Sequence, residues 1–253
     1  MTQPGSKIYK EIQSKDGDLF TIQPMLENDY SQCVKLCTNA FVKNNAVIMH
    51  LNIPEPQLYE HFEEHLRPCM ESGLSLVVKS SDNSIASMLF LETFNIYDTY
   101  TPPLESGMQP LYRIGKKSYL EAVTKNPEIL QAAARYMTMR VNMGATDVAY
   151  DGHGLGTQLR LYVETHARDL GYECITVEPI SNATRHIYEK FEWTLLANVT
   201  LANDVDKNGS RPFDGLDEGE RYTIFMKNLS PSPVYSKPIA WCVLAALKLG
   251  LVR

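Results

Sequence analysis

The chain has 253 residues, of which 44% are hydrophobic and 21% charged, the proportions of a soluble globular protein with a sizeable core. The formal net charge of -6 argues against a nucleic-acid partner and is compatible with a cationic small-molecule substrate. Its five cysteines include no CxxC pair and do not form a disulfide framework. The polar N-terminus lacks the apolar core of a signal peptide, so a cytoplasmic location is expected.

Apolar periodicity and turn residues predict a strand, two helices and a hairpin in the first part of the chain. The polar residues 1–17 are expected to form a flexible arm before a single domain that covers 18–229. The predicted elements are strands at 19–24, 74–79 and 85–94 and helices from residue 27 and over 57–71.

The connection 95–135 has a Pro-rich start and a helical second part over 117–135. Long connections in compact domains are usually functional, so this insertion is the candidate lid over an acceptor site. After it we expect strands at 137–146, 174–180, 194–201 and 220–227 and helices at 155–170 and 182–191. Gly144 is expected to mark a bulge in the first of these strands.

The C-terminal part, 230–253, contains a Pro- and Ser-rich linker and an apolar segment at 239–252. This segment makes roughly 21 Å of helix, which is too short for a bilayer core of about 30 Å. We expect a short helix packed on the domain. Docking to a partner or to a membrane surface is the alternative, because an apolar helix must be covered by something.

The stretch DVAYDGHGLGTQL, residues 147–159, places three alternating glycines between a predicted strand and a predicted helix. Its spacing fits neither the dinucleotide fingerprint G-x-G-x-x-G nor a P-loop. A strand, glycine turn and helix direct backbone N–H groups and the positive helix end at one point, which favours a pyrophosphate. Glycine also permits positive φ and close approach of a ligand. A simple strand-to-helix turn is the alternative interpretation.

A second motif follows about thirty residues later in SNATRHIYEKFEW, which contains Asn182, Ala183, Tyr188, Glu189, Lys190 and Trp193. Together the two motifs resemble the GCN5-related N-acetyltransferases, the GNAT superfamily, over about residues 19–228. The acetyl-coenzyme A signature of that family is Arg or Gln, two residues, Gly, one residue, and Gly or Ala. Here Asp151, Gly154 and Gly156 occupy the three positions.

The resemblance implies an α/β (α+β) GNAT fold, a mixed and mostly antiparallel sheet flanked by helices, with acetyl-coenzyme A as cosubstrate and no metal. In the family the pantetheine arm runs between two splayed strands, here 137–146 and 174–180. Tyr188 matches the tyrosine that protonates the thiolate of coenzyme A in many relatives. The residues expected to bind the cofactor are Ala145, Thr146, Gly152, His153, Gly154, Leu155, Gly156, Thr157 and Asn182.

The general base is left open by the sequence. Glu178, near the end of CITVEP, would approach the reaction centre from the strand side. Asp147 is an alternative, although its match to the family's Asp suggests a role in the turn or as a cap. Many relatives use an ordered water instead.

Asp151 is the main departure from the family pattern. A carboxylate a few Å from a phosphate is repulsive by roughly 1 to 4 kcal/mol, depending on screening. Either Asp151 points to solvent, or cofactor binding is weakened, or the site holds another ligand.

The predicted reaction is transfer of an acetyl group to a primary amine of a small molecule. The insertion 95–135 resembles the arylalkylamine branch of the superfamily. That branch carries an acidic residue and a proline after its first helix, where this chain has Asn44, Asn45 and Ala46, so that base is not transferred. The alternatives are a protein lysine or N-terminal acetyltransferase with an open acceptor groove, and a catalytically silent acyl-CoA-binding regulatory module.

The segment HFEEH is the strongest rival from another reaction class. His61, Glu64 and His65 fit the H-x-x-E-H pattern of inverted zinc proteases, and both imidazoles could share one helix face. The surrounding glutamates favour a solvated helix surface instead. We therefore predict no metal site here.

Overall fold

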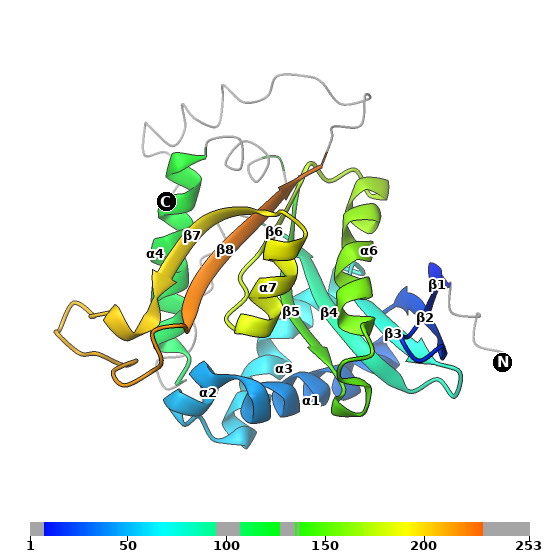
Figure 1. Cartoon of the computed structure of the whole chain (residues 1–253), viewed down its shortest axis with the longest axis horizontal. Helices are drawn as coiled ribbons and strands as arrows, with labels where there is room; N and C mark the ends of the chain where they lie inside the picture. Colours follow the sequence, from blue (N-terminus) through cyan, green and yellow to red (C-terminus); the bar gives the residue numbers. More distant parts are fainter. Residues whose placement is uncertain (1–7, 95–106, 127–134, 136, 230–253) are drawn as a thin grey trace.

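The computed structural model describes residues 8–94, 107–126, 135 and 137–229. They form a mixed sheet in the order β1-β2-β3-β4-β5-β6-β8-β7, in which β5 and β6 are parallel and every other neighbouring pair is antiparallel (Figure 1). The strands are β1 (Lys10–Gln13), β2 (Leu19–Pro24), β3 (Leu76–Ser80), β4 (Ile85–Thr93), β5 (Thr138–Thr146), β6 (Cys174–Val177), β7 (Thr194–Thr200) and β8 (Arg221–Asn228). The predicted mixed, mostly antiparallel sheet is confirmed.

Helices cover both faces of the sheet, and a separate apolar core lies on each side (Figure 1). One face carries α1 (Glu27–Asn44), α2 (Ala46–Leu51), α3 (Glu55–Glu71) and α4 (Gln109–Lys125). The other face carries α6 (Leu155–Asp169) and α7 (Asn182–Lys190). The parallel pair β5 and β6 is buried between the two layers, as parallel strands usually are.

The ordered part of the chain begins earlier than the sequence predicts. Within the expected flexible arm, Lys10–Gln13 pair antiparallel with β2, and Ile12 lies opposite Phe20 in the core. Sequence analysis detects a strand by the alternation of apolar and polar residues, and a four-residue strand with one buried side chain is too short to show it. Residues 1–7 lie outside the described residues.

Two further elements differ from the prediction. α4 begins at Gln109, earlier than predicted, and ends at Lys125, while 127–134 of the predicted helix lie outside the described residues. Pro110 is tolerated because it lies in the first turn of the helix. The short helix α2 was not predicted, and its N-cap is Asn45, whose side chain accepts hydrogen bonds from the N–H groups of Val47 and Ile48.

The sheet opens between β5 and β6. Their pairing covers only Thr138–Val141 and Cys174–Val177, while β5 continues to Thr146. β6 is shorter than the predicted 174–180, because Pro179 has no N–H to donate to a ladder. The register shift in β5 falls at Asn142, between the partners of Phe90 and Leu91, and not at Gly144 as expected. The expected splay between these strands is therefore present.

None of the helices in the described part of the chain has the length and apolar character needed to cross a bilayer. The C-terminal helix expected at 239–252 and two parts of the expected lid, 95–106 and 127–134, fall outside the described residues. Docking through 239–252 stays a prediction.

Candidate active site

A cavity of about 640 Å³ lies at the opening between β5 and β6. At one end it is lined by the glycine turn and the start of α6, and at the other by side chains of α1, α3 and α4. Residues 177–181, after β6, form one wall and residues 140–146 of β5 form the opposite wall. The cavity thus joins the predicted cofactor end to the predicted acceptor end.

The glycine turn leaves the start of α6 open to a ligand. Gly152 and Gly154 have φ of 79° and 83°, a region that L side chains rarely adopt. Gly154 is the N-cap of α6, and no side chain among the described residues caps it. The first N–H groups of the helix, those of Leu155, Gly156 and Thr157, are therefore available for an anion at the positive helix end.

Gly156 allows the helix to lie directly on β5. A Cβ atom at this position would be 2.6 Å from Thr146 Oγ1, closer than real Cβ contacts come, and in a tight contact of 3.1 Å with Arg160 Nη1. Thr146 is held in turn by Ser87, whose Oγ lies 3.0 Å from Thr146 Oγ1. This close approach brings the helix start to the edge of β5, where a ligand would contact both.

Seven of the nine predicted cofactor-binding residues line the cavity: Ala145, Thr146, Gly152, Gly154, Leu155, Gly156 and Thr157. Asn182 does not line it, since at the start of α7 its amide donates to Glu220 Oε1 at 3.1 Å. His153 is also directed elsewhere, with Nε2 2.9 Å from Asp16 Oδ2. Asp147 caps the short turn after β5 through the N–H of Ala149, as its alternative role predicted.

The turn between β1 and β2 packs against the glycine turn. The N–H of Lys15 donates to His153 O at 3.1 Å, and Gln158 Nε2 donates to Gln13 O at 2.8 Å. The Lys15 side chain passes beside Gly154, with Cε 3.5 Å from the place a Cβ would occupy there, and it lines the cavity. A lysine from the predicted flexible arm thus lies beside the start of α6, and the exposed Asp151 lines the same cavity.

Tyr188 lies where the resemblance implied. It is 1% exposed, and its ring packs 4.8 Å from Trp193 and 6.0 Å from Phe225. It lines the cavity, and no group in the described part of the chain makes a hydrogen bond of normal geometry to its hydroxyl. Burial raises the pKa of the hydroxyl, and the nearby Arg160 guanidinium offsets part of that rise. Tyr188 is therefore protonated at neutral pH.

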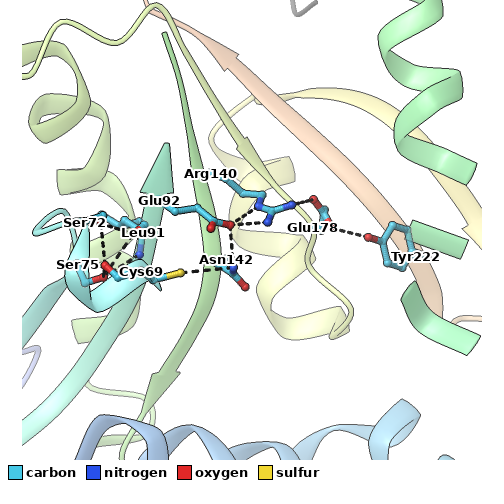
Figure 2. A network of polar contacts seen from close by, with 9 residues as sticks. All are labelled: Cys69, Ser72, Ser75, Leu91, Glu92, Arg140, Asn142, Glu178 and Tyr222. Carbon is cyan, nitrogen blue, oxygen red and sulfur yellow. Dashed lines mark hydrogen bonds and ion pairs between the residues drawn. The ribbon is translucent and has the colours of Figure 1, made fainter. Parts of the chain in front are cut away.

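The acceptor end holds a charged network that sequence reasoning missed (Figure 2). Arg140 lies between two carboxylates, with Nη2 2.5 Å from Glu92 Oε1 and Nη1 3.9 Å from Glu178 Oε1. Burial alone would lower the pKa of Arg140, but the two carboxylates outweigh it and raise that pKa. Asn142, at the bulge of β5, donates to Glu92 Oε1 at 2.8 Å.

Only one of the two carboxylate oxygens of Glu178 accepts a hydrogen bond from a described residue. The Tyr222 hydroxyl donates to Oε2 at 2.5 Å, as Figure 2 shows. Oε1 is buried and accepts no hydrogen bond from any described residue. A buried carboxylate oxygen without a donor is costly, so a donor supplied by a ligand would stabilise it. The structure therefore brings Glu178 and Tyr188 to the same cavity.

The two histidines of HFEEH lie together but Glu64 does not join them. His61 and His65 stack with ring centroids 5.7 Å apart, whereas Glu64 is exposed. No group of three or more potential ligands occurs among the residues that the structure describes. His65 lines the cavity, where burial, then Arg140 and His61, lower its pKa to about 4. It is a neutral ring in the acceptor wall at pH 7.

No family model matches the sequence, and no curated protein is significantly similar to it. Solved structures share its fold. Arylalkylamine N-acetyltransferase 2 from Aedes aegypti gives a TM-score of 0.66 at 14% identity, over 83% of this chain and 99% of that one. The C-terminal condensation domain of Ebony, in complex with beta-alanyl-dopamine, gives 0.67 at 15% identity, over 83% and 98%. A Drosophila melanogaster polyamine N-acetyltransferase that forms N-acetylagmatine gives 0.60 at 12% identity, over 83% and 100%.

The chain therefore has the fold of the GCN5-related N-acetyltransferases, as the two motifs predicted. The arrangement of its helices and strands is similar to that of the Aedes aegypti arylalkylamine N-acetyltransferase 2. At these identities the likeness establishes the fold, and the reaction has to be argued from the site itself.

Proposed function

We propose that this protein transfers an acetyl group from acetyl-coenzyme A to the primary amine of a small molecule. The observation that carries the proposal is one continuous cavity. It joins the N-terminus of α6, which no described side chain caps, to Glu178 Oε1, which accepts no hydrogen bond from a described residue. Acetyl transfer to an amine needs an anion site for the cofactor and a proton acceptor for the amine. The two ends of this cavity supply groups of those two kinds.

The residues at the cofactor end fit coenzyme A. The N–H groups of Leu155–Thr157 would hold the pyrophosphate, and the backbone of Ala145 and Thr146 would hold the pantetheine amides and support the developing oxyanion. Asp151 is exposed, so solvent screens its charge, and the Lys15 side chain beside Gly154 brings a positive charge to the same end of the cavity. The departure at Asp151 is therefore compatible with a phosphate ligand.

The acceptor end favours a cation with one positive charge. Arg140 compensates one of the two carboxylates, Glu92 and Glu178, and His65 is neutral, so these buried groups leave one negative charge over; Lys116 also lines the cavity, but it is exposed. An ammonium group would balance that charge. The neighbouring wall is aromatic, with Phe41, Phe94, Tyr112, Tyr119 and Tyr222. An aromatic monoamine fits this combination better than a polyamine, which would need more than one free carboxylate.

Each step of the transfer can then be assigned to a residue. Glu178 Oε1 takes a proton from the ammonium, directly or through a water, and so produces the nucleophilic amine. The amine nitrogen bonds to the acetyl carbon and loses its second proton to solvent, the carbon–sulfur bond breaks, and the electron pair of that bond goes to sulfur. Tyr188 gives its hydroxyl proton to that sulfur and is reprotonated from solvent. His65 is a second neutral base at the same end of the cavity.

A thiol-release assay with acetyl-coenzyme A and a panel of amines tests this proposal. The panel contains tyramine as an aromatic monoamine, agmatine as a guanidino amine, spermidine as a polyamine and a lysine peptide as a protein substrate. We expect turnover to be fastest with tyramine. Fastest turnover with the peptide would favour a protein acetyltransferase. Coenzyme A binding without turnover of any amine would favour a silent acyl-CoA-binding module.

A further inference from the structure

Arg160 carries a positive charge inside the protein, and it forms no ion pair with a carboxylate of the described residues. Its side chain belongs to α6, and the residue is only 9% exposed. Nη1 donates to Gly156 O at 2.9 Å, while Nε is buried and has no acceptor among the described residues. Arg140, the other guanidinium in the cavity wall, is paired with Glu92. A buried cation without a counter-ion is costly, and it points to an anion that arrives with a ligand.

The guanidinium lies where the walls of the cofactor end converge. Nη2 is 3.1 Å from the place a Cβ would occupy at Gly144 of β5, and Nη1 is 3.1 Å from the corresponding place at Gly156 of α6. Both glycines and Arg160 line the cavity, and so does Tyr188 of α7. α6 and α7 cover the same face of the sheet (Figure 1). The charge thus lies alongside β5 and beside Tyr188, deeper than the helix start that would hold the pyrophosphate.

The proposed reaction creates an anion in this region. When the carbon–sulfur bond breaks, the electron pair stays on sulfur, and the thiolate is protonated by Tyr188. Proton transfer from tyrosine, with an ordinary pKa of about 10, to a thiolate with an ordinary pKa of about 8.5 is unfavourable. Burial makes it more so by raising the pKa of Tyr188, and Arg160 acts in the opposite direction.

We propose that Arg160 is a positioning residue whose buried charge stabilises the leaving thiolate of coenzyme A and the tyrosinate that Tyr188 becomes when it protonates that sulfur. This inference rests on the proposed function. It assigns the charge to the sulfur end of the cofactor and not to its phosphates.

A comparison of two ligands distinguishes a charge at the sulfur end of the cofactor from a charge at its phosphates. The ligands are coenzyme A and desulfo-coenzyme A, which has hydrogen in place of the thiol. Both are measured by titration calorimetry at pH 7 and pH 9. For the wild type we expect the affinity for coenzyme A to rise roughly tenfold over that interval, because the bound thiol ionises at lower pH than free thiol, whose pKa is about 8.5. The affinity for desulfo-coenzyme A should stay nearly constant.

Arg160→Met removes the charge and keeps an unbranched chain, and Arg160→Lys keeps the charge. We expect the Met variant to bind each compound with nearly the same affinity at pH 7 and pH 9. Its kcat should fall, with little change in KM for acetyl-coenzyme A. The Lys variant should restore most of both properties. Arg160→Gln repeats the test with a polar neutral side chain if the Met variant does not fold.

Two results would overturn the inference. One is equal pH dependence of the two compounds in the wild type. The other is an equal loss of affinity for both compounds in Arg160→Met, which would place the charge on the phosphates or the pantetheine. If the wild type binds neither compound, the proposed function itself fails, and this inference fails with it.

Discussion

Lys15 is predicted to supply the cofactor charge that the glycine motif lacks at Asp151. Its side chain reaches the start of α6 from the β1–β2 turn and passes within 3.5 Å of the Cβ position of Gly154. The ammonium can therefore approach a phosphate at the helix start to about 4 Å. Lys15→Ala removes this charge and keeps the hydrogen bond to His153 O, because the backbone N–H of residue 15 donates it.

The size of the effect follows from the exposure of the residue. Two unit charges at 4 Å interact by about 1 kcal/mol in water and about 4 kcal/mol near a protein surface with an effective dielectric constant of 20. Lys15 is exposed, so we expect a value near the lower end. A loss of about 1 to 1.5 kcal/mol corresponds to a roughly 5- to 12-fold rise in Kd for coenzyme A.

Calorimetric titration at 50 and 300 mM salt measures this change and its origin. The advantage of the wild type over Lys15→Ala should shrink at high salt, because exposed charges are screened. Lys15→Arg should bind like the wild type, and Lys10→Ala, an exposed lysine on β1 that does not line the cavity, is the matched control. Equal affinity of wild type and Lys15→Ala at 50 mM salt would refute the reasoning, and so would an equal loss for pantetheine, which has no phosphate.

Three other changes test the remaining groups. Tyr188→Phe should lower kcat by roughly 10- to 100-fold with little change in affinity for coenzyme A, and unchanged turnover would remove Tyr188 from the chemistry. Glu178→Gln should lower kcat/KM for the amine by roughly 100-fold at pH 7, and retention of full activity would favour His65 or water as the base. Burial, then Arg140 and His61, depress the pKa of His65 to about 4 from the ordinary histidine value of 6.5. The unfolded chain therefore binds more protons between these two pH values, and stability rises with pH across that window. Urea unfolding measures the rise in the free energy of unfolding between pH 5 and pH 7. This rise should be about 2 kcal/mol smaller for His65→Gln than for the wild type, whereas substitution of the exposed His186 by Gln should leave it unchanged.

The local elements and the two glycine- and tyrosine-containing motifs were predictable because their signals are short in sequence. Alternation, helix periodicity and glycine spacing act over a few residues; they place Tyr188 on its helix correctly, whereas Glu178, predicted inside a strand, lies one residue beyond the end of β6. The network around Arg140 was not predictable, since it joins β4, β5 and the end of β6 across the sheet. Lys15 was missed for the same reason: only the docking of the β1–β2 turn brings it to Gly154.

Arg160 shows a different limit. In a helix whose buried positions include Leu155, Leu159 and Val163, an arginine next to Leu159 is expected to reach solvent. Arg160 is buried here because this side of α6 faces the cavity at the opening between β5 and β6 and not the solvent. A cavity wall cannot be distinguished from a solvated helix face by composition alone.

The contact between the β1–β2 turn and the glycine turn links cofactor binding to the order of the N-terminal hairpin. Three contacts join the two turns: Lys15 N–H to His153 O, Gln158 to Gln13, and His153 to Asp16. By thermodynamic linkage, if docking of the hairpin strengthens binding of the cofactor, the cofactor strengthens docking of the hairpin by the same factor. Slower amide exchange in 10–13 on addition of coenzyme A would report this reciprocity, and the most N-terminal strand would then serve as a sensor of an occupied site formed more than a hundred residues later in the chain.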